Sequence, residues 1–92
     1  LYFTASPPYV HIHLYNKKHL VSLTLKSVLE RTGGKPFIRI HKSTIVNVKE
    51  VVSLTSRHNG DYDLVMKNDA QLRLSRNYAA AFKEAFQQLA VV

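Results

Sequence analysis

The chain has 92 residues, no cysteine and a formal charge of +7, with 13 Lys and Arg against 6 Asp and Glu. This length suits one domain, and the lack of cysteine excludes disulfides and thiolate metal sites. A hydrophobic fraction of 46% argues against disorder, and no apolar run approaches the ~20 residues that a membrane-spanning helix needs.

The first part of the chain predicts three short strands. Tyr2–Thr4 is strand-like, and Pro7-Pro8 then marks a loop because proline cannot donate to a β-ladder. Tyr9–Tyr15 is apolar at every second position, which is typical of a half-buried strand. A turn at residues 16–18 leads to His19–Leu23, which we expect to return as the partner strand of a hairpin.

A change of period after this hairpin predicts a short helix over Thr24–Arg31. Thr24 is a suitable N-cap, apolar residues recur at helical spacing, and Gly33-Gly34 would end the helix as a C-cap does. Phe37–His41 and Thr44–Val48 then return to the strand pattern.

The second half predicts a β-meander followed by a helix. Glu50–Ser56 and Tyr62–Met66 flank the pair Asn59-Gly60, for which we expect a type I′ hairpin turn with a positive φ at the asparagine. Gln71–Leu74 is the last predicted strand, and from Ser75 the apolar residues follow helical spacing. The sequence therefore predicts a mainly β fold with a short middle helix and a C-terminal helix.

The positive charge is concentrated in the first half. Residues 1–46 carry seven cations and one anion, whereas the second half carries six cations and five anions. Arg39, His41, Lys42 and Ser43 form a basic cluster at the end of a predicted strand. Lys and Ser donate hydrogen bonds to phosphates, and Lys also to guanine, so the cluster indicates a nucleic-acid-binding surface. The alternative is a solvated turn whose charge keeps an edge strand from aggregating.

A second candidate for anion binding lies at the start of the final helix. Ser75 is placed to cap this helix, and Arg76 follows it directly. The free N–H groups of a helix N-terminus attract anions, whereas a cation there opposes the helix dipole. This mismatch indicates that Arg76 serves an anionic partner.

Little in the sequence points to catalysis or metal binding. His11 and His13 are two positions apart on one strand face, but no cysteine or nearby carboxylate offers a third metal ligand. The chain has no Gly-rich phosphate loop and no nucleophile elbow. We therefore expect no catalytic residue, no metal and no cofactor.

Two motifs resemble the LytTR domain, the DNA-binding module of LytR/AlgR-type bacterial response regulators. Phe37–Val48 reads FIRIHKSTIVNV and is similar to the family pattern F-x-R-x-H-R-S-x-I-V-N. Leu74–Tyr78 reads LSRNY and resembles the S-R-R-Y-like motif before the last helix of the family. The chain departs from the family at Lys42 and Asn77, each in place of a common Arg, and at Pro7-Pro8, where a more polar loop is usual.

The resemblance implies a LytTR-like, elongated β fold over residues 1–92, as a single domain whose loops enter successive major grooves of DNA. The loops would be Ser6–Tyr9, Lys42–Ser43 and Ser75–Asn77. The DNA-binding residues that the resemblance implies are Tyr9, His41, Lys42, Ser43, Ser75, Arg76 and Asn77.

By the same resemblance, the chain is the sequence-specific output domain of a two-component transcriptional regulator, without enzymatic activity. We expect a cytoplasmic domain that forms the C-terminal part of a longer, in some cases membrane-anchored, protein with an upstream receiver or sensor module. We expect it to bind direct or inverted promoter repeats as a dimer. The alternative is a basic β module for RNA or protein interaction, in which Tyr2, Tyr9, Tyr15 and Phe37 act as stacking platforms.

Overall fold

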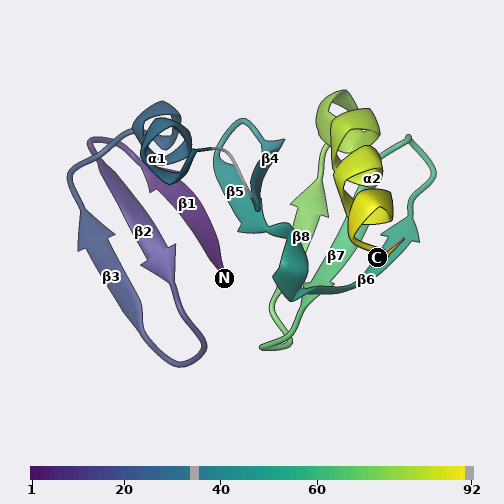
Figure 1. Ribbon diagram of the computed structural model, residues 1–92, viewed down its shortest axis with the longest axis horizontal. Coiled ribbons are helices and arrows are strands. Elements are labelled where there is room, and N and C mark those ends of the chain that lie inside the picture. Colours follow the sequence, from purple (N-terminus) through teal and green to yellow (C-terminus); the bar gives the residue numbers. More distant parts are fainter. Residues whose placement is uncertain (34–35, 91–92) are drawn as a thin grey trace.

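The computed structural model describes residues 1–33 and 36–90, and within them the chain forms two antiparallel sheets and two α-helices (Figure 1). The first sheet has five strands in the order β3-β2-β1-β5-β4. Its strands are β1 (Tyr2–Ser6), β2 (Tyr9–His13), β3 (Lys18–Val21), β4 (Phe37–His41) and β5 (Thr44–Asn47). The helix α1 (Leu25–Thr32) lies between β3 and β4 in the sequence.

The second sheet is a meander of three strands, β6 (Val51–Ser56), β7 (Tyr62–Met66) and β8 (Gln71–Leu74). A 3-10 turn, η1 (Val48–Glu50), joins the two sheets, and α2 (Arg76–Ala90) ends the described chain. The predicted fold class, mainly β with two helices, is therefore confirmed. The molecule measures 33 × 30 × 25 Å along its principal axes, so it is only slightly elongated. No helix within the described residues is long and apolar enough to cross a membrane.

Two hydrophobic clusters hold these elements together. The smaller cluster packs α1 against the first sheet through its buried members Val10, Leu25, Val28 and Ile45. The larger cluster packs α2 against both sheets, and its buried members are Ile40, Val46, Val48, Val51, Leu64, Met66, Leu74, Ala79 and Phe82. Each large apolar side chain buried in this way stabilises the fold by roughly 1.5–3 kcal/mol. Because α2 contacts β4 as well as the second sheet, the larger cluster joins the two sheets into one body.

The middle helix begins and ends as its sequence predicts. The Thr24 side chain accepts a hydrogen bond from the backbone N–H of Ser27 at 3.1 Å, which makes Thr24 the N-cap. Gly33 follows the helix with a φ of 71°, a left-handed conformation that costs glycine little. Gly34, the other half of the predicted stop signal, lies outside the described residues.

Several strand boundaries differ from the prediction. Strand β2 ends at His13, not at Tyr15, because the backbone N–H of Leu14 donates to the carbonyl of Lys17 and closes a turn there. Both Leu14 and Tyr15 are exposed. Strand β1 continues to Ser6, which pairs with Tyr9, so the predicted loop shrinks to a tight turn around the two prolines.

The turn around Asn59 also differs from the prediction. Among the described residues near it, the positive φ is at Gly60 (88°), and Asn59 has none. The last β6–β7 pair is Ser56 with Tyr62, so residues 57–61 form a longer loop than a two-residue type I′ turn. The Asn59 side chain accepts a hydrogen bond from the backbone N–H of Asp61 at 3.2 Å. The Asn59 side chain therefore accepts a hydrogen bond in this loop, and Gly60, not Asn59, adopts the left-handed backbone conformation.

His13 occupies an unusual position on the first sheet. Its ring stacks on Tyr2 with centroids 4.2 Å apart, and its Nε2 lies 2.9 Å from the Thr4 hydroxyl. Burial lowers the pKa of His13 below its usual value, and the positive charge of Lys18, its cross-strand partner, lowers it further, as does His11. The fold therefore favours the neutral imidazole.

We expect the free energy of unfolding to fall as the pH drops from about 7 to about 5, because the unfolded chain, with a His pKa near 6.5, takes up this proton before the folded chain does. The stability that neutral His13 contributes is fully present above the pKa of the unfolded chain. It is lost as the pH falls through the lower pKa of His13 in the folded chain. His13→Gln should reduce this loss in urea unfolding. His58→Gln, in the exposed β6–β7 loop, is the control. An unchanged pH dependence in His13→Gln would contradict this assignment.

Candidate nucleic-acid interface

Three connections lie together at one edge of the molecule, the upper edge in Figure 1. They are the β1–β2 turn (Ser6–Tyr9), the β4–β5 turn (His41–Thr44) and the start of α2 (Ser75–Asn77). Strands β1, β4 and β8 all run toward this edge. We call these three segments the three-loop edge.

Backbone hydrogen bonds fix the three segments in a row. The N–H of Ala5, at the end of β1, donates to the carbonyl of Ser43 at 2.8 Å. The N–H of Ser75 donates to the carbonyl of Ile40, at the end of β4, also at 2.8 Å. The β4–β5 turn is therefore held between the other two segments by rigid main-chain contacts. All seven residues that the sequence implied for DNA binding lie on this edge.

The β4–β5 turn fixes the orientation of its histidine. The Nδ1 atom of His41 lies 2.9 Å from the Ser43 hydroxyl, and it accepts the backbone N–H of Ser43 at 3.2 Å. In the tautomer in which Nδ1 accepts this N–H, the proton of the neutral ring is on Nε2. His41 therefore has an N–H donor available on the other side of its ring.

Arg39 has a different role from the one its charge suggested. Its Nε donates to the carbonyl of His41 at 3.3 Å and its Nη2 to the carbonyl of Lys42 at 2.5 Å. The guanidinium thus stabilises the turn by satisfying two of its carbonyls. The side chain of Lys42, in contrast, is exposed and forms no ion pair among the described residues.

The β1–β2 turn presents few donors. Pro7 and Pro8, joined by a cis peptide bond, have no backbone N–H. Tyr9 is 44% exposed and offers its ring and hydroxyl at this end of the edge. This turn therefore offers the ring of Tyr9 and two hydroxyl groups, those of Ser6 and Tyr9.

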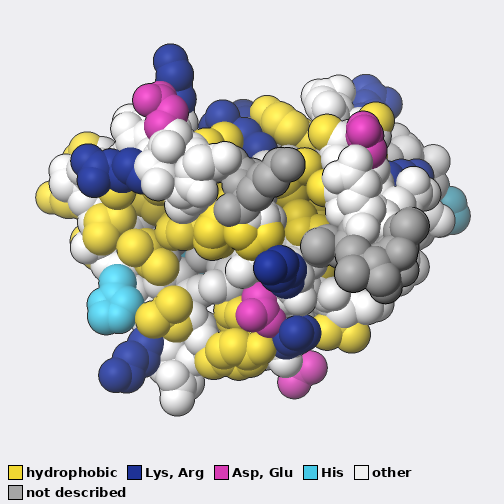
Figure 2. All heavy atoms as spheres, viewed as in Figure 1, with side chains coloured by type: hydrophobic (Ala, Val, Ile, Leu, Met, Phe, Trp, Pro, Cys, Tyr) yellow, Lys and Arg dark blue, Asp and Glu magenta, His cyan; other side chains and the backbone are white. Residues whose placement is uncertain are grey.

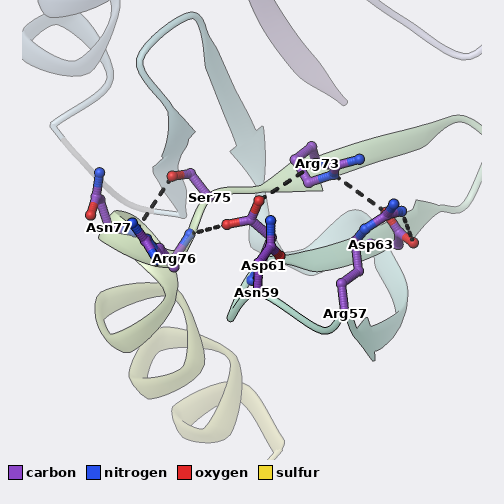
Figure 3. Close-up of polar contacts among 8 residues, drawn as sticks. All are labelled: Arg57, Asn59, Asp61, Asp63, Arg73, Ser75, Arg76 and Asn77. Atoms are coloured by element: carbon purple, nitrogen blue, oxygen red, sulfur yellow. Dashed lines mark hydrogen bonds and ion pairs between the residues drawn. The ribbon is translucent and has the colours of Figure 1, made fainter.

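The start of α2 is capped twice. The Ser75 side chain accepts the backbone N–H of Asn77 at a long 3.4 Å, while the backbone N–H of Arg76 donates to Oδ1 of Asp61 at 2.9 Å (Figure 3). Asp61 lies in the β6–β7 loop, 15 positions away in the sequence. The sequence predicted Ser75 as the cap and missed Asp61, because an Asp after Asn-Gly reads as a turn residue alone. One of the free N–H groups expected to attract an external anion is thus already occupied.

An alternating row of charges runs from this cap along the second sheet (Figure 3). Arg57 pairs with Asp63 at 2.9 Å, and Arg73 reaches Asp61 at 3.5 Å and Asp63 at 3.6 Å. The hydrogen bond from Arg76, followed by the charge of Arg73, lowers the pKa of Asp61, although partial burial opposes this. Two of the basic residues in the second half are therefore neutralised by their neighbours.

Two exposed cations of the three-loop edge, Lys42 and Arg76, are not neutralised in this way by any described residue. Arg76 and Asn77 are exposed, and Arg76, like Lys42, forms no ion pair among the residues that the structure describes. Lys and Arg side chains stand along the upper edge in Figure 2. The edge therefore combines unpaired positive charge with hydroxyl, imidazole and amide groups, which is the chemistry that binds nucleic acid.

The chain is similar in sequence to bacterial proteins whose names describe sensory transduction and transcriptional regulation. It is 27% identical over 84 residues to the sensory transduction protein LytT of Bacillus subtilis, covering 91% of this chain and 35% of that protein. It is 31% identical over 69 residues to the transcriptional regulatory protein BtsR of Escherichia coli, covering 75% of this chain and 28% of that protein. The chain thus spans about a third of the length of these relatives.

A solved structure shares the fold. The LytTr DNA-binding domain of a response regulator from Bacillus cereus superposes with a TM-score of 0.80 at 25% identity, over 91% of this chain and 77% of that one. Residues 1–87 match the family described as the LytTr DNA-binding domain. This match covers the whole three-loop edge and confirms the resemblance seen in the two motifs. The chain belongs to the LytTr DNA-binding domain family.

Proposed function

We propose that this domain binds double-stranded DNA in a sequence-specific manner by inserting the three-loop edge into successive major grooves. The observation that carries the proposal is the three-loop edge itself, where backbone hydrogen bonds align Lys42 and Arg76, both without ion pairs among the described residues. Loops held in this way present base-reading side chains with little loss of conformational entropy on binding.

Each segment has a distinct role in this proposal. Arg76 donates a bidentate pair of hydrogen bonds to guanine O6 and N7, and Asn77 offers an amide suited to adenine. Lys42 donates to guanine or to a phosphate, and His41 donates from Nε2, since its Nδ1 is engaged by Ser43. The remaining members, Tyr9, Ser43 and Ser75, contact the sugar-phosphate backbone or order the segments that read bases.

In the longer protein, the domain acts in the cytoplasm as the output of a transcriptional regulator, with no catalytic step of its own. The family description and the names of the relatives support this role. An upstream receiver or membrane sensor module supplies the signal. Pairs of domains bind direct or inverted promoter repeats as a dimer, and contacts outside this domain hold the pair together.

The alternative of an RNA-stacking module has less support. Tyr2 is stacked on His13, and Phe37 packs edge-on against Phe3 with ring centroids 5.5 Å apart. Both rings are partly buried and pack against the hydrophobic clusters as well, so less of each ring is free to stack on a base. Tyr15 is exposed, but it lies at the β2–β3 turn, away from Tyr9 and the three-loop edge.

Base-analogue duplexes test the major-groove proposal. A duplex is first selected from a random pool with the purified domain, and each guanine is then replaced in turn. Replacement by 7-deazaguanine removes the N7 acceptor in the major groove, and we expect a loss of about 1–3 kcal/mol at the guanine that Arg76 reads. Replacement by inosine removes the 2-amino group in the minor groove and should matter much less.

The opposite pattern, sensitivity to inosine but not to 7-deazaguanine, would place the protein in the minor groove. Equal affinity for the single strand and the duplex would favour the alternative of an RNA-type module.

A further inference from the structure

We propose that Asp61 is a positioning residue for base recognition, which fixes Arg76 in the orientation that reads DNA. This inference rests on the proposed role of Arg76 at the three-loop edge. It assigns a function in recognition to the β6–β7 loop, for which the sequence predicted a hairpin turn and no contact with DNA.

The carboxylate of Asp61 is held at the start of α2 from several sides. Its Oδ1 accepts the backbone N–H of Arg76 at 2.9 Å, and its Oδ2 lies 3.5 Å from Arg73. Its own backbone is fixed as well, because its carbonyl accepts from Arg57 at 2.8 Å and its N–H donates to Asn59 at 3.2 Å. The Asp61 side chain is only 17% exposed. The acceptor for Arg76 thus lies in a loop that these hydrogen bonds and the contact with Arg73 hold in place beside the second sheet.

The same loop also supports the side chain of Arg76. A Cβ atom placed at Gly60 would lie 3.5 Å from Cβ and 3.7 Å from Cδ of Arg76, so the aliphatic part of that side chain passes directly over the glycine. Asp61 therefore fixes the backbone of Arg76, while Gly60 supports its aliphatic part. A long side chain that is ordered before binding loses less conformational entropy when it contacts a base.

The charge of Asp61 suits this role. A cation in the first turn of a helix opposes the helix dipole, and a carboxylate at the same place compensates for it. The depressed pKa of Asp61, caused first by the hydrogen bond from Arg76, keeps it ionised at neutral pH. The N-terminus of α2 is thus stabilised by the chain's own carboxylate, and the guanidinium of Arg76 is left to meet DNA.

Three substitutions separate geometry from charge. Asp61→Asn keeps the length of the side chain and an oxygen acceptor but removes the charge, whereas Asp61→Glu keeps the charge but moves the acceptor by one methylene. Asp61→Ala removes both. The control is Asp63→Ala, which removes a carboxylate that pairs with Arg57 and Arg73 but does not contact Arg76.

The measurement is binding-site selection, followed by titration of the selected duplex and of duplexes altered at each position. We expect Asp61→Ala and Asp61→Glu to lower the preference for the base that Arg76 reads by on the order of tenfold. Asp61→Asn should retain the preference and bind all duplexes somewhat more tightly, because one negative charge is gone. Asp63→Ala should change the affinity for all duplexes equally.

The reverse pattern overturns the proposal. If Asp61→Glu behaves as the unaltered protein and Asp61→Asn behaves as Asp61→Ala, only the charge of Asp61 matters. Should Asp61→Ala fail to fold, as judged by circular dichroism, the Asn and Glu variants decide the question without it.

Arg76→Ala in the same selection separates this inference from the proposed function. If Arg76→Ala loses a base preference and the Asp61 variants do not, only the role of Asp61 is wrong. If Arg76→Ala loses none, the reading of DNA by Arg76 fails, and the role of Asp61 fails with it.

Discussion

Affinity for duplex DNA is expected to fall roughly a hundredfold when the salt concentration rises from about 50 to about 200 mM, which corresponds to about four phosphate contacts. Of the 13 Lys and Arg residues, three form ion pairs with carboxylates of the second half. These are Arg57, Lys67 and Arg73. The first half carries seven cations against one anion. At the three-loop edge, Lys42 and Arg76 form no ion pair among the described residues and are available to phosphates.

Titration of a fluorescently labelled duplex at increasing salt measures this slope. Lys42→Ala should lower the slope by about one unit if it removes one phosphate contact. Lys17→Ala, which removes the same charge from the β2–β3 turn at the opposite edge, should leave it unchanged. A flat salt dependence, or no binding at low salt, would exclude nucleic acid as the partner.

Replacing Arg76 by alanine is expected to cost about 1–3 kcal/mol on the preferred duplex and to relax the preference at one base position. The reason is that Arg76 stands at the first residue of α2, where Asp61 and Gly60 hold it and no ion pair among the described residues engages its guanidinium. Anisotropy titrations of the preferred duplex, and of duplexes with each other base at that position, measure both effects.

Lys17→Ala is again the matched control, since it removes one positive charge without touching the three-loop edge. A loss of affinity in Arg76→Ala that is equal for every base would show that Arg76 contributes only to the positive field.

Much of the fold follows from local patterns in the sequence. Alternation placed β4 and β5, and the Thr24 cap with Gly33 placed α1, because these signals depend on neighbours within a few residues. The motifs around Lys42 and Arg76 are also local, so they could be recognised from the sequence alone.

The parts that sequence reasoning missed depend on contacts between distant segments. Asp61 caps a helix that begins 15 positions later, and no local pattern reports such a contact. Arg39 looked like part of a binding cluster, although its guanidinium is engaged by the carbonyls of His41 and Lys42. Charge can be counted from a sequence, but whether a charged side chain is free or already bonded depends on the tertiary structure.

The most direct test of DNA reading by the three-loop edge is binding-site selection with the unaltered domain and with Lys42→Ala, Arg76→Ala and Lys17→Ala. We expect Arg76→Ala to change the selected sequence at one base position. Lys42→Ala should change it at a different position if Lys42 donates to guanine, and should lower the affinity for all sequences alike if Lys42 contacts only a phosphate. Lys17→Ala should select the same sequence as the unaltered domain. Reading of DNA by the three-loop edge is contradicted if all three variants select the same sequence, or if Lys17→Ala changes the selected sequence while Lys42→Ala and Arg76→Ala do not.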